Sequence, residues 1–178
     1  DIQDHFGRRL SFTYNAQNLL SEITTPTAEK ITYTYADGNL ASVTYPDTHS
    51  RHYSYTSVTV GGHVEPALLT GLTDENASPY ATWTYDPSAL AASSEHAGGA
   101  DRHSLIYQKD ATGKITGSTV TNPLAAVTLY QFENILGANR VSTISQPLVP
   151  GLTRRFTYDA NGNLLSQTDF NGQLTTYT

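Results

Sequence analysis

The chain has 178 residues, a formal net charge of −6, 38% hydrophobic residues and 15% charged residues. Its lysines and arginines are scattered, which excludes the basic patch that binding to a nucleic acid or an anionic membrane would need. It has no cysteine, so disulfides and thiolate metal sites are excluded as well.

Strands are predicted throughout, because the chain is rich in threonine and in tyrosine, with 12 tyrosines. No window carries a sustained apolar stripe at the period of a helix. No stretch approaches the roughly 20 apolar residues that span a bilayer. The length suits a single domain and is expected to allow a sizeable buried core.

The first two predicted units each consist of a strand, a turn and a return strand. Residues Leu10–Tyr14 alternate apolar or aromatic side chains with Ser and Thr, and Asn18 then stands where a turn glycine is expected. Residues Ile31–Tyr35 repeat the alternation, and a turn one residue shorter follows at Asp37-Gly38.

A longer interval separates the next two units. After Tyr55, residues Val58–Val64 predict a hairpin that reverses at Gly61-Gly62. Residues Thr82–Tyr85 form the following strand, after which Ala89 replaces the turn glycine.

The third region has less regular turns. Residues 105–107 lead to a lengthened turn that contains Gly113. Residues 129–131 lead to a turn at 133–136, in which Asn134 takes the place of the glycine. Prolines within residues 146–151 exclude a central strand, so a loop is predicted there.

The clearest copy lies near the C-terminus. Residues Phe156–Tyr158 form a strand, residues 159–163 form a turn around Gly162, and Leu164 begins the return strand. Residues 174–178 predict one further opening strand.

One tyrosine recurs in each copy at intervals of about 20 to 30 residues, which is typical of a repeat array. We therefore interpret residues 1–178 as one segment of about seven repeats, truncated at both ends, with longer insertions near residues 56–80 and 131–155. The predicted structural anchors of the repeats are Tyr14, Tyr35, Tyr55, Tyr85, Tyr107, Tyr130, Tyr158, Tyr177, Gly38, Gly113 and Gly162.

Candidate chemical sites are weaker than the repeats. Glu95, His96, Asp101 and His103 form the densest group of potential zinc ligands, but no helix holds them on one face. Residues 159–163 differ from a calcium loop, because their glycine comes fourth rather than sixth. No Gly-x-Ser-x-Gly elbow is present. We expect no catalytic, cofactor-binding or metal-binding residues, and no enzyme activity.

The pattern resembles the YD repeats of the Rhs (RHS) family. Residues 158–164, Tyr-Asp-Ala-Asn-Gly-Asn-Leu, match that repeat in residue type. A run typical of bacterial Rhs proteins occupies residues 68–76, 80–86 and 93–101. The departures are the absent glycines at Asn18, Ala89 and Asn134 and the two long units.

The resemblance implies an all-β fold, in which an array of YD-repeat β-hairpins forms a curved, spiralling antiparallel β-sheet that is closed into a hollow shell. It implies that the chain is a structural shell segment that encapsulates a C-terminal toxin domain for delivery to target cells. It also implies a secreted or cell-surface-delivered bacterial protein whose autoproteolytic motif lies after the repeats. Asp86-Pro87 is a repeat position and not that motif.

The expected partners are the remaining repeats of a longer parent chain and the enclosed toxin. Open sheet edges at Arg9–Tyr14 and Leu174–Thr178 also predict self-association. The alternative is a carbohydrate-binding or adhesion module that uses repeated aromatic residues such as Trp83. Repetition of the aromatics in every unit favours cross-strand ladders instead.

Overall fold

A computed structural model of the chain describes residues 1–149 and 151–177, which form two compact units. Unit 1 consists of residues 1–90 and 96–98, and unit 2 consists of residues 91–95 and 99–178. Pro150 and Thr178, which the sequence assigns to a loop and to the last strand, lie outside the described residues. No helix in the described part of the chain is long and apolar enough to cross a membrane.

The elements are strands and one short 3₁₀ turn along the described residues. The chain begins with β1 (Ile2–Gln3), β2 (Arg9–Tyr14), β3 (Leu20–Thr24), β4 (Lys30–Ala36), β5 (Asn39–Thr44), β6 (Ser50–Val60), β7 (His63–Thr73) and β8 (Pro79–Tyr85). It continues with β9 (Ala91–His96), η1 (Ala97–Gly99), β10 (Ala100–Lys109), β11 (Ile115–Thr121), β12 (Val127–Ile135), β13 (Ala138–Ser145), β14 (Thr153–Tyr158), β15 (Leu164–Thr168) and β16 (Leu174–Thr176).

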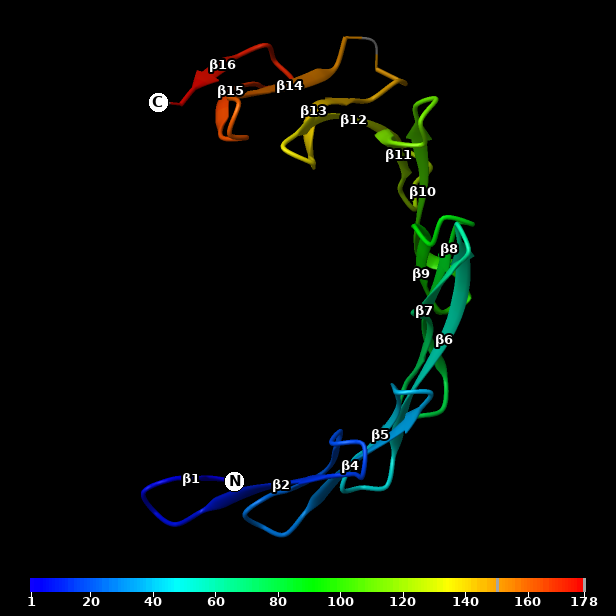
Figure 1. The fold of residues 1–178 in the computed structure, drawn as a ribbon, viewed down its shortest axis with the longest axis vertical. Helices are drawn as coiled ribbons and strands as arrows, with labels where there is room; N and C mark the ends of the chain where they lie inside the picture. The colour runs from blue at the N-terminus through cyan, green and yellow to red at the C-terminus, as the bar shows by residue number, and fades with distance from the viewer. Residues whose placement is uncertain (150, 178) are drawn as a thin grey trace. The chain divides into compact units, whose positions relative to one another are not determined.

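Each strand pairs with its neighbours in sequence. In unit 1 the order in the sheet runs from β1 to β8, and in unit 2 it runs from β10 to β16, with antiparallel pairing at each step. Figure 1 shows the strands following one another in this order within each unit. The prediction of an all-β antiparallel array of hairpins is confirmed.

The strands of unit 1 carry two chemically different faces. Side chains alternate along a strand and directly paired residues share a face, so the printed registers sort the residues. The aromatic face contains Phe12, Ile23, Tyr33, Tyr35, Val43, Tyr53, Tyr55, Leu72, Trp83 and Tyr85. The hydroxyl face contains Thr13, Thr32, Thr34, Ser42, Thr44, Ser50, Ser54 and Thr82.

Unit 2 repeats this division. Its aromatic face contains Leu105, Tyr107, Val120, Tyr130, Phe132, Ile144, Phe156 and Tyr158. Its hydroxyl face contains Ser104, Thr119, Thr121, Thr143, Thr157 and Ser166, together with the apolar Ile106 and Leu129. Hydroxyl pairs join opposite strands on this kind of face, as in Thr34 to Ser42 at 2.7 Å and Thr157 to Ser166 at 2.7 Å.

The expected sizeable core is wrong. Among the described residues, Val43 at 7% exposure and Ala81 at 5% are the only buried apolar side chains, and no side chain is fully buried. A sheet buries side chains deeply only when a second layer covers one of its faces, and neither unit has such a layer. The aromatic side chains are therefore half-buried against one another on the surface of the sheet.

Most turns follow one five-residue design. In the turn after β14, the Asp159 N–H donates to the Asn163 carbonyl and the Gly162 N–H donates to the Asp159 carbonyl. The Asp159 carboxylate accepts the N–H groups of Asn161 and Asn163 at 2.9 and 2.8 Å. The fourth residue has a positive φ, which glycine adopts without strain.

The same design tolerates residues other than glycine at its fourth position. Asn18 and Ala89 each have a φ of 60°, which confirms the prediction that they replace the turn glycine. Two-residue turns with two positive φ angles connect other strands, at Asp37-Gly38 and Gly61-Gly62 as predicted.

Two predicted turns are wrong in detail. Asn134 lies inside β12, and the reversal occurs at Leu136-Gly137. The turn after β10 is not lengthened, because residues 110–114 have the same five-residue hydrogen bonding as the others. In both places the first strand of the hairpin continues past the tyrosine, which the local sequence does not reveal.

Candidate functional site

Each hairpin is joined to the next by a short seam of paired residues. Ladders within hairpins contain four to eight pairs. The seams between hairpins contain three pairs at β3–β4, β5–β6, β7–β8, β13–β14 and β15–β16, and five pairs at β11–β12. The joint between β1 and β2 has two pairs. Each cross-strand pair contributes only about 0.2–1 kcal/mol, so these short joints are expected to be weaker than the ladders within hairpins.

Tyrosine hydroxyls reinforce three of these seams from the aromatic face. Each hydroxyl donates to a backbone carbonyl on the preceding strand, beyond the paired residues of the seam. These contacts, which we name tyrosine clasps, are Tyr35 to Leu20 at 2.8 Å, Tyr85 to Leu69 at 2.9 Å and Tyr158 to Val141 at 2.8 Å. Each clasp satisfies a half-buried hydroxyl and ties one hairpin to the next.

A β-bulge comes immediately before two of the clasp residues, Tyr35 and Tyr158, and also before Tyr14 and Tyr55, which form no clasp among the described residues. In the first hairpin Thr13 pairs with Glu22 and Tyr14 pairs with Leu20, so Ser21 is an extra residue on the return strand. A bulge bends its strand and redirects the neighbouring side chains. The same one-residue step comes immediately before Tyr35, Tyr55 and Tyr158.

The bulges were missed by the sequence analysis. Several of the extra residues carry a hydroxyl that donates back across the hairpin to the carbonyl before the step. These bonds are Ser21 to Thr13 at 3.1 Å, Thr116 to Gln108 at 3.4 Å and Ser142 to Gln131 at 3.2 Å.

The predicted anchors do not all occupy the position after the step. In the hairpins β10–β11 and β12–β13 the step falls two residues beyond Tyr107 and Tyr130, immediately before Lys109 and Phe132. Tyr107 and Tyr130 are equivalent instead to Tyr33, which lies on the same face of the sheet, two residues before the clasp residue Tyr35. The repeat position that forms clasps elsewhere therefore has no phenol in these two hairpins.

The remaining anchors are also placed by the structure. Tyr14 is 56% exposed. Tyr177 follows β16, and its hydroxyl accepts a hydrogen bond from Gln167 Nε2 at 2.7 Å. Gly38, Gly113 and Gly162 have φ angles of 80°, 86° and 82°.

Tyrosines and an arginine are packed together on the aromatic face of unit 1. Burial raises the pKa of the Tyr33 phenol, and Tyr35, Tyr45 and Tyr53 add to that effect. Burial opposes the charge of Arg51, but Glu75, Tyr45 and Tyr53 raise its pKa overall. The Arg51 Nη2 atom lies 2.8 Å from Glu75 Oε1. These contacts hold an ion pair beside the tyrosines of the aromatic face.

An arginine also lies on the aromatic face of unit 2. The guanidinium carbon of Arg154 stands 4.9 Å from the ring centroid of Phe156, and its Nη2 donates to Gln167 Oε1. Gln167 in turn donates to Tyr177. Arg154 and Arg51 both lie four residues before an anchor tyrosine, so the same repeat position places an arginine on the aromatic face in each unit.

The four candidate zinc ligands make other contacts. His96 Nδ1 lies 3.3 Å from the Tyr80 carbonyl oxygen, and the two rings meet edge to face. Glu95 forms an ion pair with Arg102 at 3.3 Å, and His103 Nδ1 lies 3.1 Å from the Asp101 carbonyl oxygen. Among the described residues no group of three or more His, Asp or Glu side chains could hold a metal ion.

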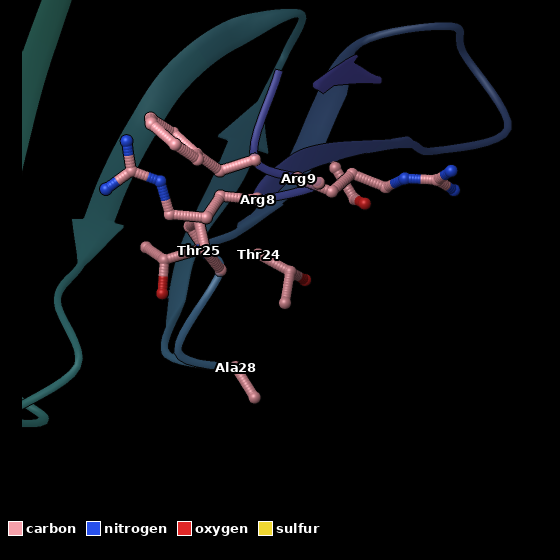
Figure 2. A pocket seen from close by; sticks show the side chains of 9 residues that line it. Arg8, Arg9, Thr24, Thr25 and Ala28 are labelled. Atoms are coloured by element: carbon pink, nitrogen blue, oxygen red, sulfur yellow. The ribbon is translucent and has the colours of Figure 1, made fainter. Parts of the chain in front are cut away.

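A shallow pocket of about 430 Å³ lies beside the first turn, where β2 begins. Figure 2 shows Arg8 and Arg9 extending in opposite directions, with Thr24, Thr25 and Ala28 on the neighbouring strand and turn. Arg8 is already paired with Asp4 at 2.6 Å, and Arg9 lies 3.3 Å from Asp1. Both arginines at the rim of the pocket are therefore already paired with aspartates of the chain, and the pocket is a shallow hollow on the surface.

A family model matches part of the repeat array. Residues 14–50, from the first anchor tyrosine to the start of β6, match the model of the RHS Repeat family. These residues form an RHS repeat. The resemblance to the RHS family is confirmed for this stretch. No curated protein matches the sequence.

Solved structures share the fold of the RHS-repeat array. The crystal structure of TcdB2-TccC3 has 16% sequence identity and a TM-score of 0.51 over 93% of this chain and 9% of that one. TcdB2-TccC3 without its hypervariable C-terminal region has 17% identity and a TM-score of 0.51 over 90% and 8% of the two chains. The crystal structure of TcdB2-TccC3-Cdc42 has 17% sequence identity and a TM-score of 0.50 over 93% of this chain and 9% of that one. The chain spans less than a tenth of each of these chains.

Proposed function

We propose that this chain is part of the wall of a container, and that the complete protein encloses a C-terminal toxin domain until delivery to a target cell. The observation that carries the proposal is the single-layer RHS-repeat sheet with one aromatic face and one hydroxyl face. A sheet of this kind has no core of its own among the described residues. Its aromatic face becomes buried only when further polypeptide covers it.

The similar solved structures also support the proposal that the chain is part of a container wall. They share this fold over about nine-tenths of the present chain, and one of them was solved without a hypervariable C-terminal region. A variable C-terminal region attached to a repeated wall fits a container with exchangeable contents. By this proposal the segment acts mechanically, without catalytic residues, and belongs to a secreted or cell-surface-delivered protein whose other repeats complete the wall.

The seams explain how such a wall holds. Each hairpin is stabilised mainly by its own ladder, and seams such as β3–β4 and β13–β14 join hairpins through three pairs plus a clasp. In an array stabilised by neighbours, one opened seam exposes the edges of two hairpins. Breaking one seam should therefore open the wall locally and expose whatever lies behind it.

The test is limited proteolysis of the complete parent protein, followed by mass spectrometry of the surviving fragments. We expect a C-terminal polypeptide that is separate from the wall yet protected, and that becomes digestible when seams are weakened by Tyr35→Phe combined with Tyr158→Phe. Immediate digestion of the C-terminal region in the intact protein, while the repeats persist, would overturn the proposal.

A carbohydrate-binding or adhesion module remains the second hypothesis from the sequence. Trp83 lies on the aromatic face and is half-buried, beside the clasp residue Tyr85. Glycan-array binding that is abolished by Trp83→Ala and retained in Tyr33→Phe would favour this hypothesis over the container.

A further inference from the structure

A pocket opens beside the first tyrosine clasp of unit 1. The register of the β3–β4 seam ends at the pair Glu22–Thr32, and the Tyr35 hydroxyl bonds the Leu20 carbonyl beyond that pair. A pocket of about 410 Å³ lies between the two hairpins there, and we name it the notch. Residues on its two sides include Asn15, Gln17, Leu19, Tyr33, Tyr35 and Asp37.

The clasp at the β13–β14 seam of unit 2 has an equivalent position beside it. In both places the accepting carbonyl belongs to the residue just before the extra serine of the bulge, which is Leu20 in unit 1 and Val141 in unit 2. Leu19 and Arg140 come immediately before these acceptors. Leu19 and Arg140 are therefore equivalent residues, each at the side of a gap between hairpins.

In unit 2 the Arg140 guanidinium crosses this gap to the next hairpin. A Cβ added at Gly162, in the turn that follows the clasp residue Tyr158, would lie 3.4 Å from both Nε and Nη2 of Arg140. The guanidinium thus packs over the backbone of that turn, where glycine leaves room for it. Unit 2 therefore contains an example of a guanidinium in a gap of this kind.

Unit 1 has the converse arrangement. Leu19 has no charged group, and nothing lies within 4 Å of a Cβ added at Gly38. Asp37 stands two residues after the clasp tyrosine, where unit 2 has Ala160. The Asp37 carboxylate forms no hydrogen bond or ion pair with the described residues, and Asp37 is the only charged residue that lines the notch. The notch therefore has an uncompensated negative charge.

The other groups of the notch also suit a guanidinium. The rings of Tyr33 and Tyr35 line it, and guanidinium groups stack on aromatic faces as well as pairing with carboxylates. The Asn15 Oδ1 atom already accepts the N–H groups of Gln17 and Leu19. The side-chain amide of Gln17 makes no hydrogen bond within the described chain, so its oxygen can accept a further N–H from a ligand.

We propose that the notch binds the guanidinium group of an arginine side chain from another polypeptide segment. Asp37 is the counter-ion, the rings of Tyr33 and Tyr35 form the packing surface, and Gln17 is a further acceptor. A lysine ammonium suits the notch less well, because it is compact, strongly hydrated and not planar. This binding site is independent of the container function.

Nuclear magnetic resonance titration of the full chain tests the proposal. The probe is Nα-acetyl-L-arginine amide, which carries the side chain without terminal charges. We expect saturable shifts of amide signals within residues 15–21 and 33–38, with a dissociation constant of about 1 mM, because one exposed ion pair and one ring contact are each weak. Nα-acetyl-L-citrulline amide has a similar shape without the charge and should bind at least about fivefold more weakly.

Two variants test the residues of the notch separately. Asp37→Asn should weaken binding of the arginine probe about fivefold. Asp101→Asn is the matched control, because Asp101 has the same φ of 51° and lies in unit 2. Leu19→Arg supplies a guanidinium from the chain itself, as Arg140 does in unit 2, and should abolish the saturable shifts. Leu124→Arg adds the same charge at an exposed turn and should leave binding unchanged.

Far-UV circular dichroism and the dispersion of the amide spectrum confirm the fold of each variant. Should Leu19→Arg fail to fold, Asp37→Asn against Asp101→Asn decides the outcome. Equal binding of the arginine and citrulline probes, or equal effects of the two asparagine variants, overturns the proposal. Tighter binding of free L-arginine than of the capped probe overturns the assignment to a polypeptide side chain.

Discussion

The two units reinforce the joints between their hairpins in different ways. In unit 1 the three-pair seams at β3–β4 and β7–β8 are each supplemented by a tyrosine clasp. In unit 2 the seam at β11–β12 has five pairs, and the residue at the clasp position is Phe132, which has no hydroxyl. The β13–β14 seam returns to three pairs and a clasp from Tyr158.

At these four seams a longer ladder and a clasp are alternative ways to reinforce the joint, whereas the β5–β6 seam has three pairs and no clasp among the described residues. A ladder adds backbone hydrogen bonds and cross-strand contacts, and a clasp adds one hydrogen bond from a side chain. The ladder requires a close approach of strands along its whole length, whereas the clasp requires only one well-placed phenol. Substitutions in the ladder and in a clasp can separate these contributions, and substitutions in the turns, with smaller expected effects, test the joints within hairpins.

The five-pair seam should be most sensitive at Gly117. A Cβ added there would lie 2.6 Å from the Tyr130 carbonyl oxygen and 2.8 Å from Gln108 Oε1. Gly117→Ala should therefore force the β11 and β12 strands apart and destabilise the fold by about 1–3 kcal/mol in chemical denaturation.

Gly71→Ala is the matched control in unit 1. Its added Cβ would lie 3.5 Å from the Ser54 Cβ, an ordinary contact. Because alanine also restricts the unfolded chain, we expect Gly71→Ala to be neutral or stabilising by up to about 1 kcal/mol. Equal losses at both glycines would show that the close approach of the Tyr130 carbonyl oxygen is not the reason for the loss at Gly117.

Removal of a clasp should have the next largest effect. Tyr35→Phe leaves the Leu20 carbonyl without its phenol donor and should cost about 1 kcal/mol of stability. Hydrogen exchange should accelerate at the β3–β4 seam more than within the β4–β5 hairpin. Tyr33→Phe, on the same strand and face, should change little, because the Tyr33 hydroxyl has no hydrogen bond to the described residues. Comparable losses from both variants would contradict a specific clasp.

A smaller gain is expected at the turn where alanine replaces glycine. Ala89 has a φ of 60°, a conformation that costs an L-residue energy and that glycine adopts freely. Ala89→Gly should therefore stabilise the turn by up to about 1 kcal/mol despite the greater freedom of the unfolded chain. Thermal unfolding measures the shift, and Gly162→Ala should move the midpoint in the opposite direction.

The smallest expected effect is the dependence of stability on acidic pH through the turn carboxylates. The side chain of Asn163, followed by its N–H, lowers the pKa of Asp159, and the hydroxyl of Thr112 lowers that of Asp110. A carboxyl whose pKa is lowered by folding stabilises the protein above its unfolded pKa, and this stabilisation is lost as the pH falls through the folded value. The turn at Asn122, which has a neutral amide in the same role, should be insensitive.

Thermal unfolding between about pH 5 and pH 2 tests this difference. The midpoint of the native chain should fall with pH, and Asp159→Asn should make that fall shallower by replacing the carboxylate with an amide. An unchanged slope in Asp159→Asn would show that the turn carboxylate contributes nothing to acid sensitivity.

Much of the fold could be predicted because its signals are local. The alternation in Phe156-Thr157-Tyr158 predicts a strand with two unlike faces, and Asp159 with Gly162 predicts the turn that follows. The hairpin at Gly61-Gly62 and the positive φ at Ala89 were predictable for the same reason. The turn predicted at Asn134 was wrong, since asparagine suits a turn but also fits an exposed position of a long strand.

The clasp sites could be predicted only in part. Tyr35, Tyr85 and Tyr158 were identified as anchors from their recurrence, but their acceptors are 15 to 17 residues away and on another strand. Tyr107 and Tyr130 look identical in sequence, yet they lie two residues before the bulge step. A single extra residue on the partner strand moves the anchor position, and no local pattern records that residue.

Residue type and spacing within one hairpin are sufficient to predict the strands, most of the turns, the two unlike faces of the sheet and the RHS character of the repeat. The pairing of strands establishes which tyrosines form clasps, which carbonyls accept their hydrogen bonds and how many pairs each seam contains, and it leaves no side chain fully buried among the described residues. These features arise from the register between strands and from the absence of a second layer in either unit, and both are properties of strands in contact rather than of any one segment.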